Sequence, residues 1–191
     1  MPVSSNVRRP QIAPSTIMNI SFQIQSKDKA EFLQHWASKY RDPNEKKYLS
    51  NIDKSLTNES LQELFEWKNG SIISTTKLRS ITENYPLSFK GDPAERYLNH
   101  KKPGGAIWNI FFLHCLNPKK WPIFDQHSYR AMRYLKTSNI TEIGNTNRLK
   151  YVAYQCEYIP FFKEFSSSNS RQIDMALFSF GQFLKLAKRY A

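Results

Sequence analysis

The sequence predicts an all-α protein. From residue 27 onward, apolar residues recur every three to four positions, which is the period of a helix. After the N-terminal arm, no stretch alternates between apolar and polar residues as a strand would, and proline, glycine or asparagine separates the periodic stretches. The chain has 191 residues, of which 40% are hydrophobic and 14% aromatic, so it can build a substantial core. We expect an extended arm over residues 1–26 and a helical domain over 27–191, made of two small lobes that share a groove.

Helices of the first half are predicted from spacing and from end signals. In residues 27–40, Phe32, Trp36 and Tyr40 recur every four positions; Ser26 is the expected cap, and the helix ends before Pro43. Further helices are predicted over residues 58–68 and 74–84, and a short one begins at Asp92-Pro93, a favourable cap followed by a first-turn proline.

The second half contains the expected centre of the fold. A Lys-Pro-Gly-Gly turn at residues 102–105 leads into residues 106–116, a helix that is apolar nearly all round and therefore buried. Helices follow over residues 126–136, over 147–165 with a bend at Pro160, and over 171–190 after a serine-rich link.

Charge indicates the class of partner. The chain carries 28 Lys plus Arg against 16 Asp plus Glu, a net charge of +12. Such a surface attracts polyanions and gains from counterion release at each phosphate contact, so nucleic acid is the leading expected partner, ahead of an anionic membrane.

Cysteines and hydrophobic runs bear on the environment of the protein. Cys115 and Cys156 lie in apolar helical patterns without zinc-ligand spacing, and we expect buried thiols, no metal and no cofactor. There is no signal-peptide pattern and no run long enough to span a bilayer. We therefore expect a cytoplasmic protein, associated with the nucleoid if the source is bacterial.

The residue singled out for chemistry is Asp125, which follows the apolar segment Trp121–Phe124 at the expected start of the helix over 126–136. An aspartate in this place is commonly only a helix cap. The positive helix terminus and the apolar neighbours, however, would hold it ionised and partly shielded from water. Such a carboxylate can activate water or stabilise a cationic sugar. Nearby cations that could hold flanking phosphates are Lys119, Lys120, His127, Arg130 and Arg133.

This stretch resembles the signature of the helix-hairpin-helix DNA glycosylases. In that superfamily a glycine-containing hairpin enters a buried helix, and after a short loop a hydrophobic segment with an early proline ends in the catalytic aspartate. Here residues 103–116 and 122–127 follow that order. The form Asp125-Gln126-His127 is most similar to the 8-oxoguanine glycosylase branch, whose histidine contacts a DNA phosphate. The resemblance implies excision of a modified or damaged base at Asp125.

The hairpin departs from the family pattern. The family reads Leu-Pro-Gly-Val-Gly, whereas this chain has only Lys102-Pro103-Gly104-Gly105. Lys102 and the backbone of Gly104 and Gly105 are nevertheless expected to contact DNA. Bifunctional relatives carry a lysine early in the buried helix, but no lysine stands at that position here, near residues 104–106. Lys101 and Lys102 lie just upstream and could reach the site only if the turn is rearranged. We therefore favour a monofunctional, water-using enzyme over a lyase. The four cysteines of the iron–sulfur relatives are also absent.

Residues for the base pocket and for DNA distortion are less sharply indicated. Trp108, Phe124 and Gln126 are the candidates for the pocket, with the C-terminal group Phe178, Phe180 and Phe183 as further stacking surfaces. The segment Trp67–Gly70 could supply the wedge that fills the stack, although Trp67 equally suits a core position. His114 lies on the apolar helix and is expected to be a buried, hydrogen-bonded histidine.

Three classes of function remain open on the sequence. The leading one is a monomeric DNA glycosylase, in repair or in defence against phage DNA with modified bases such as hypermodified cytosine. The alternative is a non-catalytic module on the same fold that grips or senses DNA. The third is a basic helical adaptor for protein or membrane partners.

Overall fold

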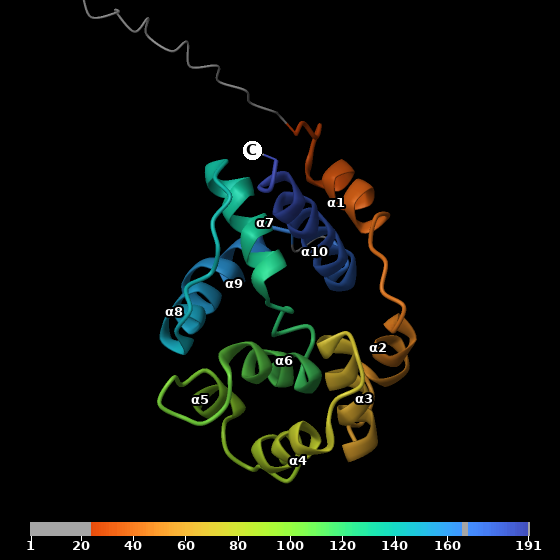
Figure 1. Ribbon diagram of the computed structural model, residues 1–191, viewed down its shortest axis with the longest axis vertical. Coiled ribbons are helices and arrows are strands. Elements are labelled where there is room, and N and C mark those ends of the chain that lie inside the picture. The colour runs from red at the N-terminus through yellow and green to blue at the C-terminus, as the bar shows by residue number, and fades with distance from the viewer. Residues whose placement is uncertain (1–23, 166–167, 191) are drawn as a thin grey trace, which may run out of the picture.

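The computed structural model describes residues 24–165 and 168–190, and within them the protein is all-α, as predicted (Figure 1). The first half contains α1 (Lys29–Ala37), α2 (Glu45–Asn51), α3 (Asn58–Asn69), α4 (Thr75–Asn84) and α5 (Pro93–Tyr97). The second half contains α6 (Ala106–Leu116), α7 (Gln126–Thr137), α8 (Asn147–Val152), the π-helical segment η1 (Ala153–Tyr158), α9 (Ile159–Lys163) and α10 (Ser170–Ala187).

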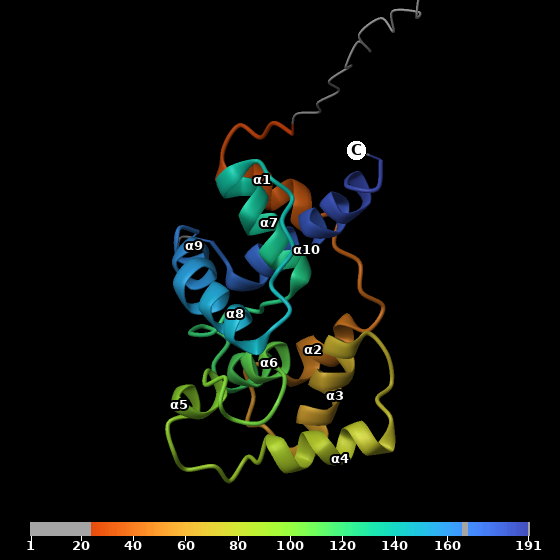
Figure 2. The same cartoon turned by 60° about the vertical axis from the view of Figure 1, so that its left-hand side comes forward.

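The helices bury two hydrophobic clusters. One is formed mainly by α1 and α7–α10, and the other by α2–α6. In Figures 1 and 2 these two groups occupy opposite halves of the molecule, and the chain passes from the first to the second after α1 and returns before α7. The N- and C-terminal parts of the described chain therefore share one half.

Helix α6 belongs to both clusters, which explains its sequence. Ala106 and Ile110 pack into the first cluster, whereas Phe111, Phe112 and Leu113 pack into the second. A helix that contacts apolar neighbours on all sides has no solvated face to keep polar, so the central position predicted for residues 106–116 is confirmed.

A glycine sets how closely α7 and α10 approach. Gly181 of α10 lies against the start of α7, where an added Cβ atom would come within 2.0 Å of the His127 carbonyl oxygen. The missing side chain therefore lets the two helices touch through their backbones. Helix α1 covers the other side of α10, with Trp36 packed on Phe180 at 4.8 Å between ring centroids.

The hairpin before α6 depends on the first of its two glycines. Gly104 has φ +103°, and a Cβ there would meet the Asn109 side chain at 2.3 Å. Asn109 is itself buried, donates to the Tyr151 hydroxyl at 2.7 Å and accepts from the Tyr85 hydroxyl at 2.8 Å. The short hairpin is thus fixed by a buried amide that ties it to α8 and to the end of α4.

Several sequence predictions need correction. Helix α2 was not predicted, because its seven residues bury only Tyr48 and show no periodic pattern. Helix α1 is capped by Asp28 rather than Ser26. The helix around Pro160 is continuous from α8 to α9. Proline has no N–H to donate to the preceding turn, and the π-helical segment before it widens the helix at this point. Cys115 is buried, but Cys156 is exposed, so the prediction of two buried thiols was wrong for Cys156.

Parts of the predicted arm and of the serine-rich link lie outside the described residues. Of the arm, residues 24–26 are described, and Ile24 packs against the first hydrophobic cluster.

Candidate functional site

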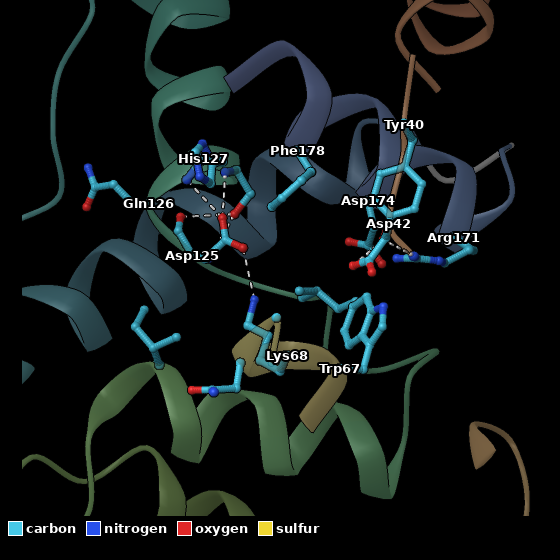
Figure 3. A pocket seen from close by; sticks show the side chains of 15 residues that line it. Tyr40, Asp42, Trp67, Lys68, Asp125, Gln126, His127, Arg171, Asp174 and Phe178 are labelled. Carbon is cyan, nitrogen blue, oxygen red and sulfur yellow. Dashed lines mark hydrogen bonds and ion pairs between the residues drawn. The ribbon is translucent and has the colours of Figure 1, made fainter. Parts of the chain in front are cut away.

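A cavity of about 380 Å³ lies where the two clusters meet. Its walls come from the segment after α1, the end of α3, the start of α7 and one face of α10 (Figure 3). Ligand pockets in proteins have volumes of roughly 300–1,000 Å³, so this cavity has room for a small organic group. Asp125, Gln126 and His127 of the predicted site all line it.

Asp125 is the cap of α7, as predicted. Its Oδ1 accepts hydrogen bonds from the backbone N–H groups of His127 at 2.8 Å and Ser128 at 3.0 Å. The Ser128 hydroxyl in turn accepts from the Asp125 N–H at 2.9 Å, which completes a capping box. The backbone and one carboxylate oxygen are thereby fixed, and the second oxygen faces the cavity region (Figure 3).

The second oxygen of Asp125 meets an amine that the sequence did not indicate. Lys68, near the C-terminal end of α3, places its Nζ 2.9 Å from Asp125 Oδ2. The two side chains are only 9% and 18% exposed, and the ammonium also lies 5.8 Å from the centre of the Phe111 ring. Lysine at this depth requires a partner, and Asp125 provides it.

The net effect on Asp125 is strong acidity. Burial raises the pKa of this carboxyl, but the charge of Lys68, the backbone bond from Ser128 and the hydrogen bond from Lys68 together outweigh burial and lower it to about 2. Asp125 is therefore ionised at neutral pH, as the sequence predicted. The N–H groups at the start of α7 are the predicted cause, and the charge of Lys68 is a second cause that the sequence did not pair with Asp125.

A second carboxyl lines the same cavity in the opposite state. Asp174 of α10 is 5% exposed, and its Oδ1 has no hydrogen-bond partner in the described structure. Burial raises the pKa of Asp174 to about 8, because the lowering influence of Arg171, Lys68 and a backbone bond from Ile123 only partly offsets it. Asp174 is thus predominantly a neutral carboxylic acid at pH 7.

The adjacent arginine does not neutralise Asp174 through a direct ion pair. Arg171 is committed to Glu45, with its Nη2 2.7 Å from each carboxylate oxygen, and to the Tyr40 hydroxyl at 2.9 Å. Its guanidinium also lies over the Trp67 ring at 5.1 Å. These contacts join α10 to α2 and α3 across the cavity. Sequence reasoning missed Arg171, because 126 residues separate it from Glu45.

The aromatic wall agrees with the prediction for Phe178 but not for Phe124. Phe178 lines the cavity and contacts the rings of His127 at 4.9 Å and Tyr40 at 5.8 Å. Phe124 was predicted for this role, but it is fully buried among Tyr129, Tyr154 and Tyr158 and cannot stack on a ligand. Phe180 is likewise a core residue.

The predicted roles of Trp108 in the base pocket and of Trp67 as a wedge also need correction. Trp108 lies outside the cavity, where it stacks on Phe65 and is covered by the Lys77 ammonium at 4.2 Å from the ring centre. Trp67 lines the cavity but is 7% exposed and donates to Glu45, so it is a core residue and not a wedge. The exposed apolar side chain of the loop after α3 is Ile72, at 83%.

The cations predicted to contact DNA fall into two groups. Lys102, Lys119 and Lys120 are exposed, as are Gly104 and Gly105 of the hairpin, so these residues are accessible to a phosphate. Arg130 is 2% exposed, and its guanidinium binds Glu142 and the Gly181 carbonyl. The prediction of a phosphate contact was therefore wrong for Arg130, which instead fastens α7 to α10.

Three predicted features of the site are more constrained than the sequence indicated. The Ala106 N–H at the start of α6 donates to the Asn147 side chain at 3.1 Å, so this amide is not free for a phosphate. Gln126 lines the cavity but donates its amide to Glu142. His127 is half-buried, and burial lowers the pKa of its ring, so the ring is neutral at pH 7.

His114 has the buried role expected of it. Its Nδ1 donates to the Trp121 carbonyl at 2.7 Å, and its Nε2 accepts from the Tyr48 hydroxyl at 2.8 Å. Burial lowers the pKa of this ring to about 3. His114 is therefore a neutral bridge between α6, α2 and the loop that delivers Asp125.

Comparisons with known proteins return no match to a family model, a curated protein or a solved structure. In residues 24–165 and 168–190, no three His, Cys, Asp or Glu residues come together as a metal site. No helix among these residues is long and apolar enough to cross a membrane.

Proposed function

We propose that this chain is a DNA glycosylase that hydrolyses the N-glycosidic bond of a flipped modified or damaged nucleotide at Asp125. The observation that carries the proposal is the ionised, mostly buried carboxylate of Asp125 at the wall of a cavity between two helical clusters. The resemblance of residues 103–127 to helix-hairpin-helix glycosylases is consistent with this role.

Electrostatics supports a DNA partner. The net charge of +12 favours a polyanion, and Lys102, Lys119 and Lys120 are exposed on the segments that lead into and out of α6. In the proposal these side chains, with the amides of Gly104 and Gly105, hold the backbone, while the target nucleotide rotates into the cavity. The two clusters of helices are the two lobes of the proposed glycosylase, and the DNA lies across the groove between them.

Asp125 acts on the sugar. As the bond between C1′ and the base breaks, its electron pair leaves with the base and positive charge develops on C1′ and O4′. A fixed carboxylate in a poorly solvated site stabilises that charge strongly. Water then adds at C1′ and loses a proton, which yields a free base and an abasic site. Lys68 keeps Asp125 ionised and aligned throughout.

Lys68 also supports a second candidate activity, that of a lyase. Its amine lies 2.9 Å from Asp125, in place of the helix-borne lysine that the chain lacks. In this version the neutral amine attacks C1′, the base leaves, and the resulting imine promotes elimination of the 3′ phosphate. Lys68 would first lose its ammonium proton to solvent, and the departing base would take up the proton that the attacking amine releases.

The central test is Asp125→Asn. Asparagine caps a helix as well as aspartate does, so the fold should persist while the charge is lost. We expect excision from a panel of oligonucleotides and phage DNAs with modified bases to fall roughly 100-fold or more. A far-UV circular dichroism spectrum that remains native at the assay temperature serves as the control, because the unpaired Lys68 lowers the melting temperature. A variant that releases free base at the wild-type rate would refute the proposal.

The same assay separates hydrolysis from lyase action. A hydrolase leaves abasic sites that break only in alkali, whereas a lyase nicks without it and is trapped on DNA by borohydride. If borohydride traps the wild-type protein on DNA but not the Lys68→Met variant, the lyase activity of Lys68 is established. A wild-type protein that binds DNA tightly but releases no base from the panel would instead favour the alternative function, a non-catalytic DNA-binding module.

A further inference from the structure

The cavity contains a polar group that the chemistry at Asp125 does not use. Asp174 lies on α10, one helical turn before Phe178, and both residues line the cavity. In Figure 3, Phe178 lies between Asp125 and Asp174, so the two carboxyl groups stand on either side of an aromatic ring. A ligand that stacks against Phe178 with its reacting atom near Asp125 would extend toward Asp174.

Asp174 is also incompletely hydrogen-bonded. One oxygen is held by the Ile123 backbone, and Oδ1 has no partner in the part of the chain that the structure describes. A buried polar atom without a partner costs free energy, and such atoms in native proteins commonly have a functional reason. Arg171 directs its Nε and Nη2 groups to Glu45 and Tyr40 and makes no ion pair with Asp174 in the described residues.

We propose that Asp174 selects the base, and that the substrate is an amino base of the cytosine or adenine class rather than a lactam base such as uracil or 8-oxoguanine. This inference rests on the proposed function. An amino base presents an unprotonated ring nitrogen beside an exocyclic amine. A carboxylic acid matches that edge: its O–H donates to the ring nitrogen, and its carboxyl oxygen accepts from the amine.

The basicity of the ring nitrogen decides the preference. The ring nitrogen of an amino base is a stronger hydrogen-bond acceptor than a lactam carbonyl oxygen, so the hydrogen bond that it receives from the neutral acid is stronger. A lactam presents a ring N–H and a weakly basic carbonyl oxygen at the same position, so its bond to the acid is weaker. An ionised carboxylate would be different again, because it accepts only and would favour an edge with two donors.

The surroundings keep Asp174 neutral near pH 7. Burial raises its pKa, the charges of Arg171 and Lys68 lower it and the ionised Asp125 raises it, and the net value is about 8. Three tyrosine hydroxyls from α2 and η1 interact with it electrostatically and are themselves neutral, because burial raises their pKa values. The groups facing Asp174 are Arg171, Lys68, Asp125, Tyr48, Tyr154 and Tyr158.

The experiment compares two bases that differ at this edge alone. Duplexes carry one mispaired 5-hydroxymethylcytosine or one mispaired 5-hydroxymethyluracil on a 2′-fluorinated sugar that resists hydrolysis. Affinity is measured with the otherwise unchanged protein, so that Asp125 stays ionised beside Asp174. We expect 5-hydroxymethylcytosine to bind about 10-fold more tightly at pH 6.5. The preference should fade at pH 9, where Asp174 has lost its proton.

Two variants of Asp174 complete the test. Asp174→Asn retains a donor and an acceptor that do not titrate, so its preference should persist at pH 9. Asp174→Leu has neither and should bind both bases equally at either pH. Equal binding of the two bases by the Asp174 protein, or an undiminished preference in Asp174→Leu, would overturn the inference.

Failure of the inference differs from failure of the proposed function. Excision of both bases at equal rates by the wild-type protein would leave a glycosylase without selection by Asp174. A 10-fold binding preference without release of either base would leave selection by Asp174 in a module that performs no chemistry.

Discussion

Asp125 and Asp174 line one cavity, yet the fold gives them opposite charge states. Asp125 receives two backbone N–H bonds and an ammonium 2.9 Å away, and its pKa falls to about 2. Asp174 receives one backbone bond and no direct ion pair, and its pKa rises to about 8. Both carboxyls are buried, so burial alone does not set the charge. The number of donors aimed at each one does.

The contrast assigns different tasks to the two ends of the cavity. A carboxylate that stays ionised can stabilise a cation, whereas a neutral acid can donate a hydrogen bond to a ligand. Separated pKa values of this kind are common in sites that need an anion and an acid together. In the proposed enzyme, Asp125 faces the sugar and Asp174 faces the base.

The largest expected effect is on the pH dependence of stability. Asp174 holds its proton to about pH 8 in the folded state but loses it near pH 3.8 when unfolded. The folded state therefore binds the extra proton between these values, and stability falls as pH rises, by at most about 1.4 kcal/mol per unit. Asp174→Asn should remove this slope and be more stable than the wild type at pH 8.

Urea unfolding at pH 5, 6.5 and 8 measures that slope. Asp174→Leu also cannot ionise, so it should show the same loss of pH dependence despite lacking polar atoms. A wild-type slope that survives in both variants would mean that another group binds the proton, and the contrast between the two carboxyls would be wrong.

The next largest effect is the loss of stability expected when a side chain is added between α7 and α10, the helices that carry the two carboxyl groups. Gly181→Ala places a methyl group 2.0 Å from the His127 carbonyl oxygen, which is backbone and cannot rotate away. We expect a loss of about 3 kcal/mol, measured by thermal or urea unfolding. Gly105→Ala is the matched control, since its new Cβ meets only the Trp108 side chain at 3.5 Å. Equal stability of the two variants would contradict the close backbone contact.

The smallest expected effect comes from removing the cation at Asp125. Lys68→Met keeps much of the apolar stem but leaves Asp125 without its ion pair, and the pKa of Asp125 should rise. The stability that a lowered carboxyl pKa provides is present above pH 3.8 and disappears as pH falls toward 2. The variant should therefore begin acid unfolding at higher pH, with a loss of about 2 kcal/mol at pH 7.

Circular dichroism during acid titration follows this change. The exposed pair Lys29–Glu164 supplies the comparison, because Lys29→Met there should have little effect. If Lys68→Met unfolds in acid at the same pH as the wild type, then Lys68 does not hold Asp125 ionised. The two carboxyls would then differ for some other reason.

Features that depend on neighbours within a few positions could be predicted from the sequence. These are the helical period, the Asp-Pro and Asn-Gly pairs at helix ends, and the all-round apolar character of residues 106–116. The same holds for Asp125 as a cap, because its partners are His127 and Ser128. A cap is a contact within one helical turn, and the sequence contains both of its halves.

The tertiary structure decided which side chains share the site. Lys68 lies 57 residues from Asp125, and Arg171 lies 126 residues from Glu45, so no local pattern pairs them. Phe124 and Arg130 were expected at the site because they are close to Asp125 in sequence, but the loop before α7 buries Phe124 and the packing of α7 on α10 buries Arg130. The charge of a carboxyl depends on the donors that the fold brings to it, and for Asp174 the sequence by itself specified only the residue type.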